Sequence, residues 1–308
     1  LEELSGSDAG DGAVVRGNTI EDVRRLGPDR PGTAIALRPN LGGTDSAAEV
    51  ADNSFAGLDI AVTHPKGDTA DIDRSELATV VVDNQNNLQR IFTPTIQSAI
   101  TAAGNSGSGD TIEIGPGTFD ESVTIDEAGI TLNGPNAGTP GASTRVEEGT
   151  IERTVVIDGV SGVTLDGLKI AEESQTLDAG VSIRPGSSGA SGITVTNTVI
   201  DGMSAPGGGG IGDFTFGILS FGGTISDVTV TDNQITNIGT NTETQGVAVS
   251  LEKLNGSEAG DGAVVRGNTI ETVSTKDARP GTGVALRPNL EGTDSAAEVA
   301  DNSFAGLD

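Results

Sequence analysis

Short stretches of alternating apolar and polar residues recur along the chain, separated by turns rich in Gly, Asn and Asp. One kind reads GVSI, GILS, GVAVS and GVALR, at 180–183, 217–220, 246–250 and 283–287. A second kind begins at residues 163, 193, 228, 263 and 297, so its members lie 30, 35, 35 and 34 residues apart. Alternating runs bounded by turn residues predict strands.

A unit of this length with about three strands and tight turns fits one coil of a parallel β-helix. Each strand would bond to the coils before and after it, with Val and Ile pointing inward. Residues 94–104 differ, because Ile96, Ala99, Ile100 and Ala103 recur at helical spacing before Gly104. The pattern predicts an all-β solenoid with one short capping helix near its start.

The chain also repeats itself over a longer distance. DSAAEVADNSFAGLD occurs at both 45–59 and 294–308. Aligned with one gap, residues 1–59 and 251–308 share roughly 46 of about 58 positions. The offset of about 250 residues is too long for neighbouring coils, so the copies indicate the same place in two successive domains. We expect the C-terminal coils of a preceding or exchanged unit at 1–59, a linker at 60–77 and a β-helix domain at 78–308.

In this interpretation neither end of the sequence is self-sufficient. A β-helix has an open strand edge at each end, and such edges tend to pair with another chain. Because the chain begins within a repeat, upstream sequence is expected, and the segment after 45–59 would be the natural continuation of Asp308. Two arrangements complete both ends: tandem units in one long polypeptide, or separate chains that exchange residues 1–59, as in strand donation.

Three asparagines share one position in the second kind of stretch: Asn233, Asn268 and Asn302. Stacked turn asparagines can bond to each other and to the backbone, so we predict a structural turn ladder. A polar binding ladder is the functional alternative. Leu168 and Thr198 hold the same position in the two earlier coils, so the ladder is partial.

The charge of the chain indicates the kind of surface it carries. There are 45 acidic and 17 basic residues, a net charge of −28, and the acids are spread over the whole length. Dispersed acid with few lysines keeps a surface hydrated at high salt, where self-repulsion is screened. We expect a halophilic source, with an ordinary acidic secreted protein as the alternative. Nucleic acid is not expected as a partner, because phosphate binding needs clustered Lys and Arg.

The sequence gives little indication of a cofactor site or a membrane segment. The chain has no Cys, hence no disulfide and no thiolate zinc site. No cofactor is expected, although calcium or other cations can bind weakly at surface carboxylates. No run of about 18 apolar residues occurs, so no membrane span is expected, and no signal peptide is recognised.

The segment at 79–134 resembles the opening of pectinesterase-like and pectin-lyase-like right-handed β-helices. The match lies in Thr95–Ala103, Asp110–Ile114, Pro116–Phe119 and Glu121–Ile125, in the family's order of helix, GDTI-type strand, PGTF turn and ES-VTI strand. It covers about a fifth of the chain. The resemblance implies a right-handed parallel β-helix whose core is capped by the helix. It implies little about function, because this scaffold hosts enzymes, adhesins, viral fibres and surface proteins.

Two fragments resemble pectinesterase motifs. GDFTFG would place Asp213 at the family's catalytic aspartate, and QGVAVS would place Gln245 at its oxyanion glutamine. The two motifs stand in reversed order, and the family's later Arg-Pro-Trp motif cannot occur in a chain without Trp. We therefore favour inward-facing strands in which Phe214, Phe216 and Phe221 fill the core.

A pectate-lyase mechanism would need carboxylate-bound calcium and an Arg as base. Arg38, Arg184 and Arg287 follow strands at a similar coil position, but no cluster of acids accompanies them. Pairing with surface carboxylates is the expected use. Three aspartates next to Gly fit ordinary turn chemistry: Asp158, Asp166 and Asp201.

His64, Asn255 and the aromatic content complete the candidate chemistry. His64 is the only histidine and lies in a Pro- and Asp-rich linker, so a catalytic triad is not supported. Seven Phe with no Tyr or Trp count against a sugar-binding cleft, which usually stacks amphipathic rings on the sugar. Asn255 in NGS is a candidate N-glycosylation site, and Ser5 stands at its place in the first copy.

Together these features predict a structural, non-enzymatic protein with itself as partner. The expected assembly is an extracellular filament or surface fibre of a halophilic, haloarchaeal-type microbe, built from β-helix units joined end to end. Adhesion, cell bridging and matrix formation are all compatible roles. The alternatives are a polysaccharide lyase or esterase with an atypical site, and a viral fibre or spike.

Overall fold

The computed structural model describes residues 13–21, 23, 33–36, 48–51, 53–56, 60–65, 71–72, 78–82, 89–104, 109–145, 148–171, 179–204, 214–239, 245–256, 261–274, 281–288 and 297–307. The chain forms two compact units, Leu1–Gly117 and Thr118–Asp308. The division predicted at residues 59 and 77 stays a prediction.

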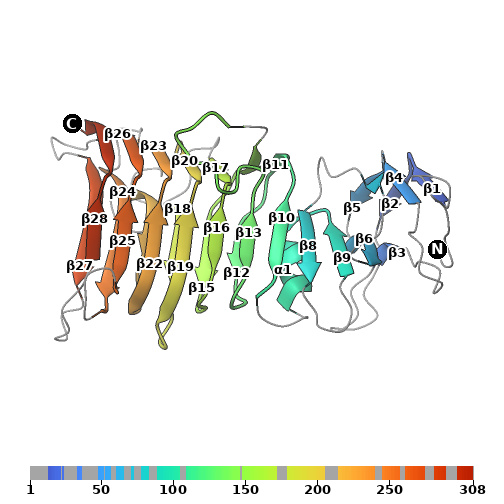
Figure 1. Cartoon of the computed structure of the whole chain (residues 1–308), viewed down its shortest axis with the longest axis horizontal. Coiled ribbons are helices and arrows are strands. Elements are labelled where there is room, and N and C mark those ends of the chain that lie inside the picture. Colours follow the sequence, from blue (N-terminus) through green and yellow to red (C-terminus); the bar gives the residue numbers. More distant parts are fainter. Residues whose placement is uncertain are drawn as a thin grey trace. The chain divides into compact units, whose positions relative to one another are not determined.

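Three strands recur in order through the second unit (Figure 1). The first strands of the coils are β12 (Val123–Ile125), β15 (Val155–Asp158), β18 (Ala179–Arg184), β21 (Phe214–Ser220), β24 (Gln245–Leu254) and β27 (Thr282–Pro288). The second strands are β13 (Thr131–Asn133), β16 (Thr164–Asp166), β19 (Ala190–Thr196), β22 (Ile225–Thr231), β25 (Ala263–Arg266) and β28 (Ala297–Ala300). The third strands are β14 (Gly149–Ile151), β17 (Lys169–Ala171), β20 (Val199–Asp201), β23 (Gln234–Ile238), β26 (Thr269–Val273) and β29 (Ser303–Leu307).

Each strand pairs in parallel with the equivalent strand of the next coil, as β22 does with β25 and β25 with β28. The unit is therefore a parallel β-solenoid, and the predicted fold class is confirmed. The third strands form a sheet of their own, here called the third sheet, in which β11 (Gly117–Phe119) precedes β14. Neighbouring coils of such a stack lie about 4.8 Å apart.

Columns of identical or similar side chains fill the interior of the solenoid. Along the second strands the column is Leu132, Leu165, Val195, Val230, Val265 and Val299. In the third sheet it is Ile151, Ile170, Ile200, Ile235, Ile270 and Phe304. All members are fully buried except the last of each column, because a side chain in a stack is covered only when coils lie on both sides of it.

In the last coil, side chains at inward positions are therefore exposed. Val299 and Phe304 occupy the inward positions of β28 and β29, yet they are 47% and 46% exposed. Below them lie Val265 and Ile270, which are buried. The C-terminal edge of the described solenoid thus carries an apolar surface.

The first unit contains both parallel and antiparallel strand pairs. Its strands are β1 (Ala13–Arg16), β2 (Thr19–Glu21), β3 (Thr33–Ala36), β4 (Ala48–Ala51), β5 (Ser54–Ala56), β6 (Ile60–Pro65), β7 (Asp71–Ile72), β8 (Ala78–Val82), β9 (Gln89–Thr93) and β10 (Thr111–Ile114). β1 pairs with β4, and β4 with β7, all in parallel. β6, β8 and β10 then take part in antiparallel pairs, β6 and β8 with β9 and β10 with β8.

The single described helix, α1 (Ile96–Gly104), belongs to the first unit. Thr95 caps it, since its Oγ1 accepts a hydrogen bond from the Ser98 amide at 3.1 Å. Ile96, Ala99, Ile100 and Ala103 are buried, and the helix packs on β8 and β9. None of the described helices is both long and apolar enough to cross a membrane.

Two pairs of described strands have the same pairing in both copies of the repeated sequence. Ala13, Val14, Val15 and Arg16 pair with Ala48–Ala51, as the identical residues Ala263–Arg266 pair with Ala297–Ala300. The pairing of β2 with β5 likewise matches that of β26 with β29. Sequence identity in the two copies thus translates into identical strand register.

Candidate functional site

The asparagines of the repeated turn form a continuous hydrogen-bonded line in the second unit. The backbone amide of Asn233 donates to Oδ1 of Asn268 at 3.0 Å, and that of Asn268 donates to Oδ1 of Asn302 at 3.0 Å. The amide of Thr198 donates to Oδ1 of Asn233 at 3.0 Å. Each carboxamide thus accepts a hydrogen bond from the coil before it.

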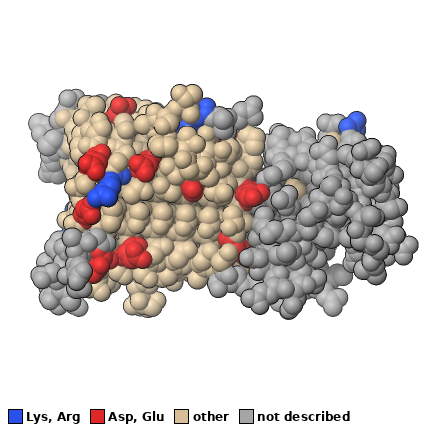
Figure 2. Space-filling model, viewed as in Figure 1, with Lys and Arg blue, Asp and Glu red and all other residues tan. Residues whose placement is uncertain are grey.

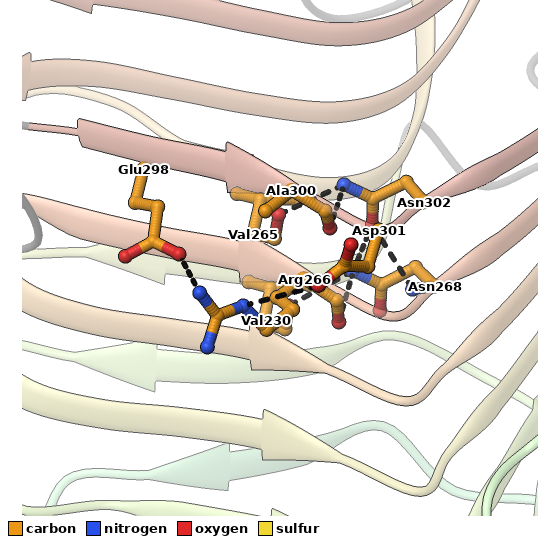
Figure 3. Close-up of polar contacts among 8 residues, drawn as sticks. All are labelled: Val230, Val265, Arg266, Asn268, Glu298, Ala300, Asp301 and Asn302. Carbon is orange, nitrogen blue, oxygen red and sulfur yellow. Dashed lines mark hydrogen bonds and ion pairs between the residues drawn. The ribbon is translucent and has the colours of Figure 1, made fainter.

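The same side chains also donate back toward the earlier coil (Figure 3). Nδ2 of Asn268 lies 2.9 Å from the Val230 carbonyl oxygen, and Nδ2 of Asn302 lies 2.8 Å from that of Val265. Asn233 and Asn268 are 1% exposed. Their carboxamides are committed to bonds between coils and offer no surface to a ligand.

The residue before each ladder position adopts a left-handed backbone conformation. Gly167, Asn197, Asp232, Gly267 and Asp301 have φ values of 68°, 51°, 56°, 68° and 54°. Gly, Asn and Asp are the residues that adopt this region at least cost. In the turns that carry the ladder, a left-handed residue is therefore followed directly by the asparagine that bonds.

A loop of the first coil covers the turns where the ladder is absent. Its residue Arg145 has an 8% exposed side chain and donates to the carbonyl oxygens of Asn197, Gly167 and Leu168 at 2.8, 3.2 and 3.0 Å. Glu148 accepts from Nε of Arg145 at 2.8 Å. This arginine was not among the sequence candidates, because the signal lies in a loop with no repeat.

The described arginines among the candidates lie apart from one another. Arg287 donates to Glu252 at 2.7 Å, and the Arg184 guanidinium lies 5.9 Å from the centre of the Phe221 ring. Arg266 pairs with Glu298 and lies 3.8 Å from Asp301 (Figure 3). Arg38 and Asp213 lie outside the described residues.

Two of the three candidate turn aspartates, Asp166 and Asp201, bond to neighbouring turns. Asp166 accepts from Nδ2 of Asn197 at 2.7 Å and from the Gly138 amide at 3.1 Å. Asp201 accepts from Thr236 and Asn237 at 3.0 and 2.8 Å. Asp158 stands opposite Arg184 in the strand register and is exposed. The carboxylates of Asp166 and Asp201 thus link successive coils.

Gln245 and His64 are each part of a β-strand. Gln245 begins β24 and pairs with Phe214 of β21. Phe214 and Phe216 stack with ring centres 6.1 Å apart, and Phe216 is buried with Leu219 and Val247. His64 lies in β6, opposite Arg90 of β9.

Among the ionisable groups of the described residues, Arg153 has a perturbed pKa. Asp120 accepts a hydrogen bond from Nε of Arg153 at 2.6 Å, and this bond and the negative charge of Asp120 raise the pKa of Arg153 above its ordinary value. The pair is exposed, so it keeps an already charged guanidinium charged and creates no acid or base for catalysis.

A shallow depression of about 210 Å³ lies beside the exposed side chain of Asn255 and is lined by Ser161, Ser191, Thr224 and Ser226. Figure 2 shows one face of the molecule, on which acidic side chains are spread among neutral residues and some lie beside a Lys or Arg. Within the described ranges no three His, Asp or Glu side chains gather closely enough to hold a metal ion.

Comparison with known proteins does not add a relative. No family model matches the chain, and neither the curated proteins nor the solved structures contain a significant match.

Proposed function

We propose that this protein is a structural, non-enzymatic subunit of an extracellular filament or surface fibre, built from β-helix units joined end to end. The observation that carries the proposal is the apolar C-terminal edge, where Val299 and Phe304 continue two buried columns and are about half exposed. Exposed inward positions on a strand edge favour addition of another strand layer.

The polar contacts of the described coils support the same function. The amides of Asn233 and Asn268 are committed within the ladder, and Arg145, Arg266 and Arg287 bond to protein carbonyls or carboxylates. These side chains hold one coil on the next. Such use of polar groups suits a long solenoid whose purpose is mechanical continuity.

The charge supports a saline, extracellular setting. A net charge of −28 disfavours close approach of two copies at low salt and permits it when salt screens the repulsion. A filament built in this way would keep a hydrated exterior around an apolar core. Adhesion, cell bridging and matrix formation are roles such a fibre can serve.

Electron microscopy of the purified protein in concentrated NaCl tests the proposal. We expect filaments, together with scattering masses that rise with protein concentration. Val299→Asp, which places a charge in the exposed edge, should abolish them, whereas Glu271→Gln on an outward strand position should not. Compact monomers at all concentrations, or turnover of an acidic polysaccharide that is lost in Arg184→Ala, would contradict the structural role.

A further inference from the structure

The repeated coil is found in two different environments. Val50 of β4 and Val299 of β28 are the same residue of the same repeated sequence, and each stands on a Val of the preceding coil. Val50 is 2% exposed because β7 pairs with β4 on its other side, with Ile72 opposite Val50. Val299 is 47% exposed. This coil is thus built to carry a further parallel layer.

The first unit presents the complementary edge. Val15 of β1 and Ile20 of β2 are half-buried, whereas their counterparts Val265 and Ile270 are fully buried under β22 and β23. Val14, on the same strand, is 57% exposed. The described face of β1 and β2 that corresponds to this covered side carries no pairing strand.

We infer that β28 and β29 of one chain bind β1 and β2 of a second copy, in parallel and in register, so that the solenoid continues from copy to copy. The inference rests on the proposed filament and names its contact surface. Val299 would lie opposite Val15, Glu298 opposite Val14, and Phe304 opposite Ile20.

The register follows from a contact already present within the chain. β25 and β1 have the same sequence, AVVR, and β25 lies on β22 with Val265 opposite Val230. β26 likewise lies on β23 with Ile270 opposite Ile235. In the proposed contact, β28 and β29 of one copy take the places of β22 and β23. β1 and β2 of the second copy then take the places of β25 and β26.

The asparagine ladder has complementary open ends. Asn18 donates to the Arg16 carbonyl and to Asn53 Oδ1, at 3.1 and 3.0 Å, as Asn268 does to Arg266 and Asn302. Asn268 has two further contacts, because it accepts from Asn233 and donates to the Val230 carbonyl. With the described residues, Asn18 makes neither of these two contacts to a preceding coil.

The C-terminal edge holds the partners that Asn18 lacks. In the ladder, the backbone amide of each asparagine donates to the asparagine of the next coil, and none of the described residues follows Asn302 in this way (Figure 3). The carbonyl oxygen of Val299 occupies the place that the Val230 carbonyl has for Asn268. Stacking would let Asn18 accept from Asn302 and donate to Val299.

The turn residues fit this junction as well. At Gly267 an added Cβ would lie 2.5 Å from Oδ1 of Asp232 in the coil before it, so an Asp turn is followed by Gly. Asp301 would be followed by Gly17 of the second copy, where a Cβ now meets nothing within 4 Å. The order Asp232, Gly267, Asp301 of the last three turns would thus continue with Gly17 across the junction.

A head-to-tail contact of this kind uses two different surfaces and leaves one of each free at the ends. Such a heterologous contact produces open polymers when successive copies do not close into a ring. The inference therefore also explains why growth would proceed along the solenoid axis.

Disulfide trapping in the 308-residue chain tests the contact, because this sequence has no Cys. Adjacent parallel strands lie about 4.8 Å apart, within the Cα separation that a disulfide spans. Tagged Val14→Cys and untagged Glu298→Cys chains are mixed in concentrated NaCl and oxidised. We expect a covalent heterodimer that forms on the order of 100-fold faster than in denaturant, since docking raises the local thiol concentration toward millimolar.

A matched control comes from the repeat itself. Val14 and Glu49 are opposite each other within one chain, so Val14→Cys/Glu49→Cys should give an internal disulfide and set the reference yield. Asp71→Cys replaces Val14→Cys in a second mixture, because Asp71 lies opposite Glu49. Preferential trapping of Glu298→Cys by Asp71→Cys would mean that β7 covers β28 by exchange and would overturn the inference.

The outcomes separate this contact from the filament itself. Filaments by microscopy without the Val14–Glu298 heterodimer would overturn the inference and leave the proposed function standing. The heterodimer without filaments would support the contact and contradict the filament. Absence of both would reject both.

Discussion

Asn268 donates both its backbone amide and its side-chain amide to Oδ1 of Asn302, at 3.0 and 2.8 Å, and so joins two coils through one oxygen. The same side chain bonds the Val230 carbonyl in the opposite direction. Asn268 thus connects three successive coils at the turn between their second and third strands.

Asn268→Ala is expected to destabilise the protein by about 2–3 kcal/mol, because it leaves buried donors and acceptors without partners. Asn302→Ala should cost only about 1 kcal/mol, since this asparagine is half-exposed at the edge, where water can replace the lost bonds. Urea denaturation followed by circular dichroism compares the two. Equal losses would show that the interior ladder is not stronger than its end.

Gly167→Ala is expected to lower the stability of the protein by more than the cost of placing Ala in a left-handed conformation. A Cβ at this position would lie 2.0 Å from the Ala137 amide nitrogen, so the covering loop would have to move. We expect about 1–3 kcal/mol from this overlap, in addition to the cost of a left-handed Ala.

Gly159→Ala is the matched control for that change. Gly159 has φ +70°, close to the +68° of Gly167, and a Cβ there meets nothing within 4 Å. It should therefore report the conformational cost alone. Thermal unfolding of both variants gives the difference, and similar melting temperatures would contradict the close contact of the loop.

Arg145→Ala is expected to cost about 2–4 kcal/mol, because a buried guanidinium that bonds three carbonyl oxygens is lost. Arg145→Lys should rescue only part, since an ammonium cannot reach all three acceptors in the same plane. Arg153→Ala, at an exposed pair, is the control and should change stability little. Faster hydrogen exchange at Gly138 and Gly141 in Arg145→Ala would locate the effect in the loop, and unchanged exchange would argue against it.

Ile270→Ala and Phe304→Ala remove neighbouring members of one column. Ile270 is fully buried, and its truncation should cost about 2–5 kcal/mol. Phe304 is 46% exposed, so its truncation should cost less than about 2 kcal/mol in the monomer. The order should reverse for filament formation, measured by sedimentation, because Phe304 lies in the proposed contact.

Salt is expected to raise the melting temperature. The net charge of −28 gives repulsion that weakens as the screening length falls from about 10 Å at 0.1 M to about 3 Å at 1 M. A melting temperature that rises steeply below 1 M NaCl, and much more than with sucrose at the same concentration, would fit this cause. A flat or falling curve would contradict the expectation of a halophilic protein.

Much of the solenoid could be predicted from local patterns. The spacing of the stretches ending in TNTVI, TDNQI and RGNTI defines one strand and one turn per coil. β25 lies within its stretch, whereas β19 and β22 begin three residues before theirs. The helix predicted at 94–104 is found at Ile96–Gly104. These features depend on side-chain alternation and turn chemistry, which are carried by residues close in sequence.

The candidate site was less accessible to sequence reasoning. The position of Asn233, Asn268 and Asn302 follows from the repeat, but the loop that covers the earlier turns through Arg145 has no periodic signal. Its contacts join residues 22 to 52 positions apart, and such pairings depend on how the loop folds back on the stack.

The sequence by itself determined the strand pattern, the coil length and the identity of the two copies, because these depend on neighbouring residues and on repetition. Only the tertiary structure decided that Val50 is covered and Val299 is exposed, although both belong to the same fifteen-residue sequence. Burial depends on which strand lies on the next layer, and identical residues with different neighbours in space therefore differ in exposure.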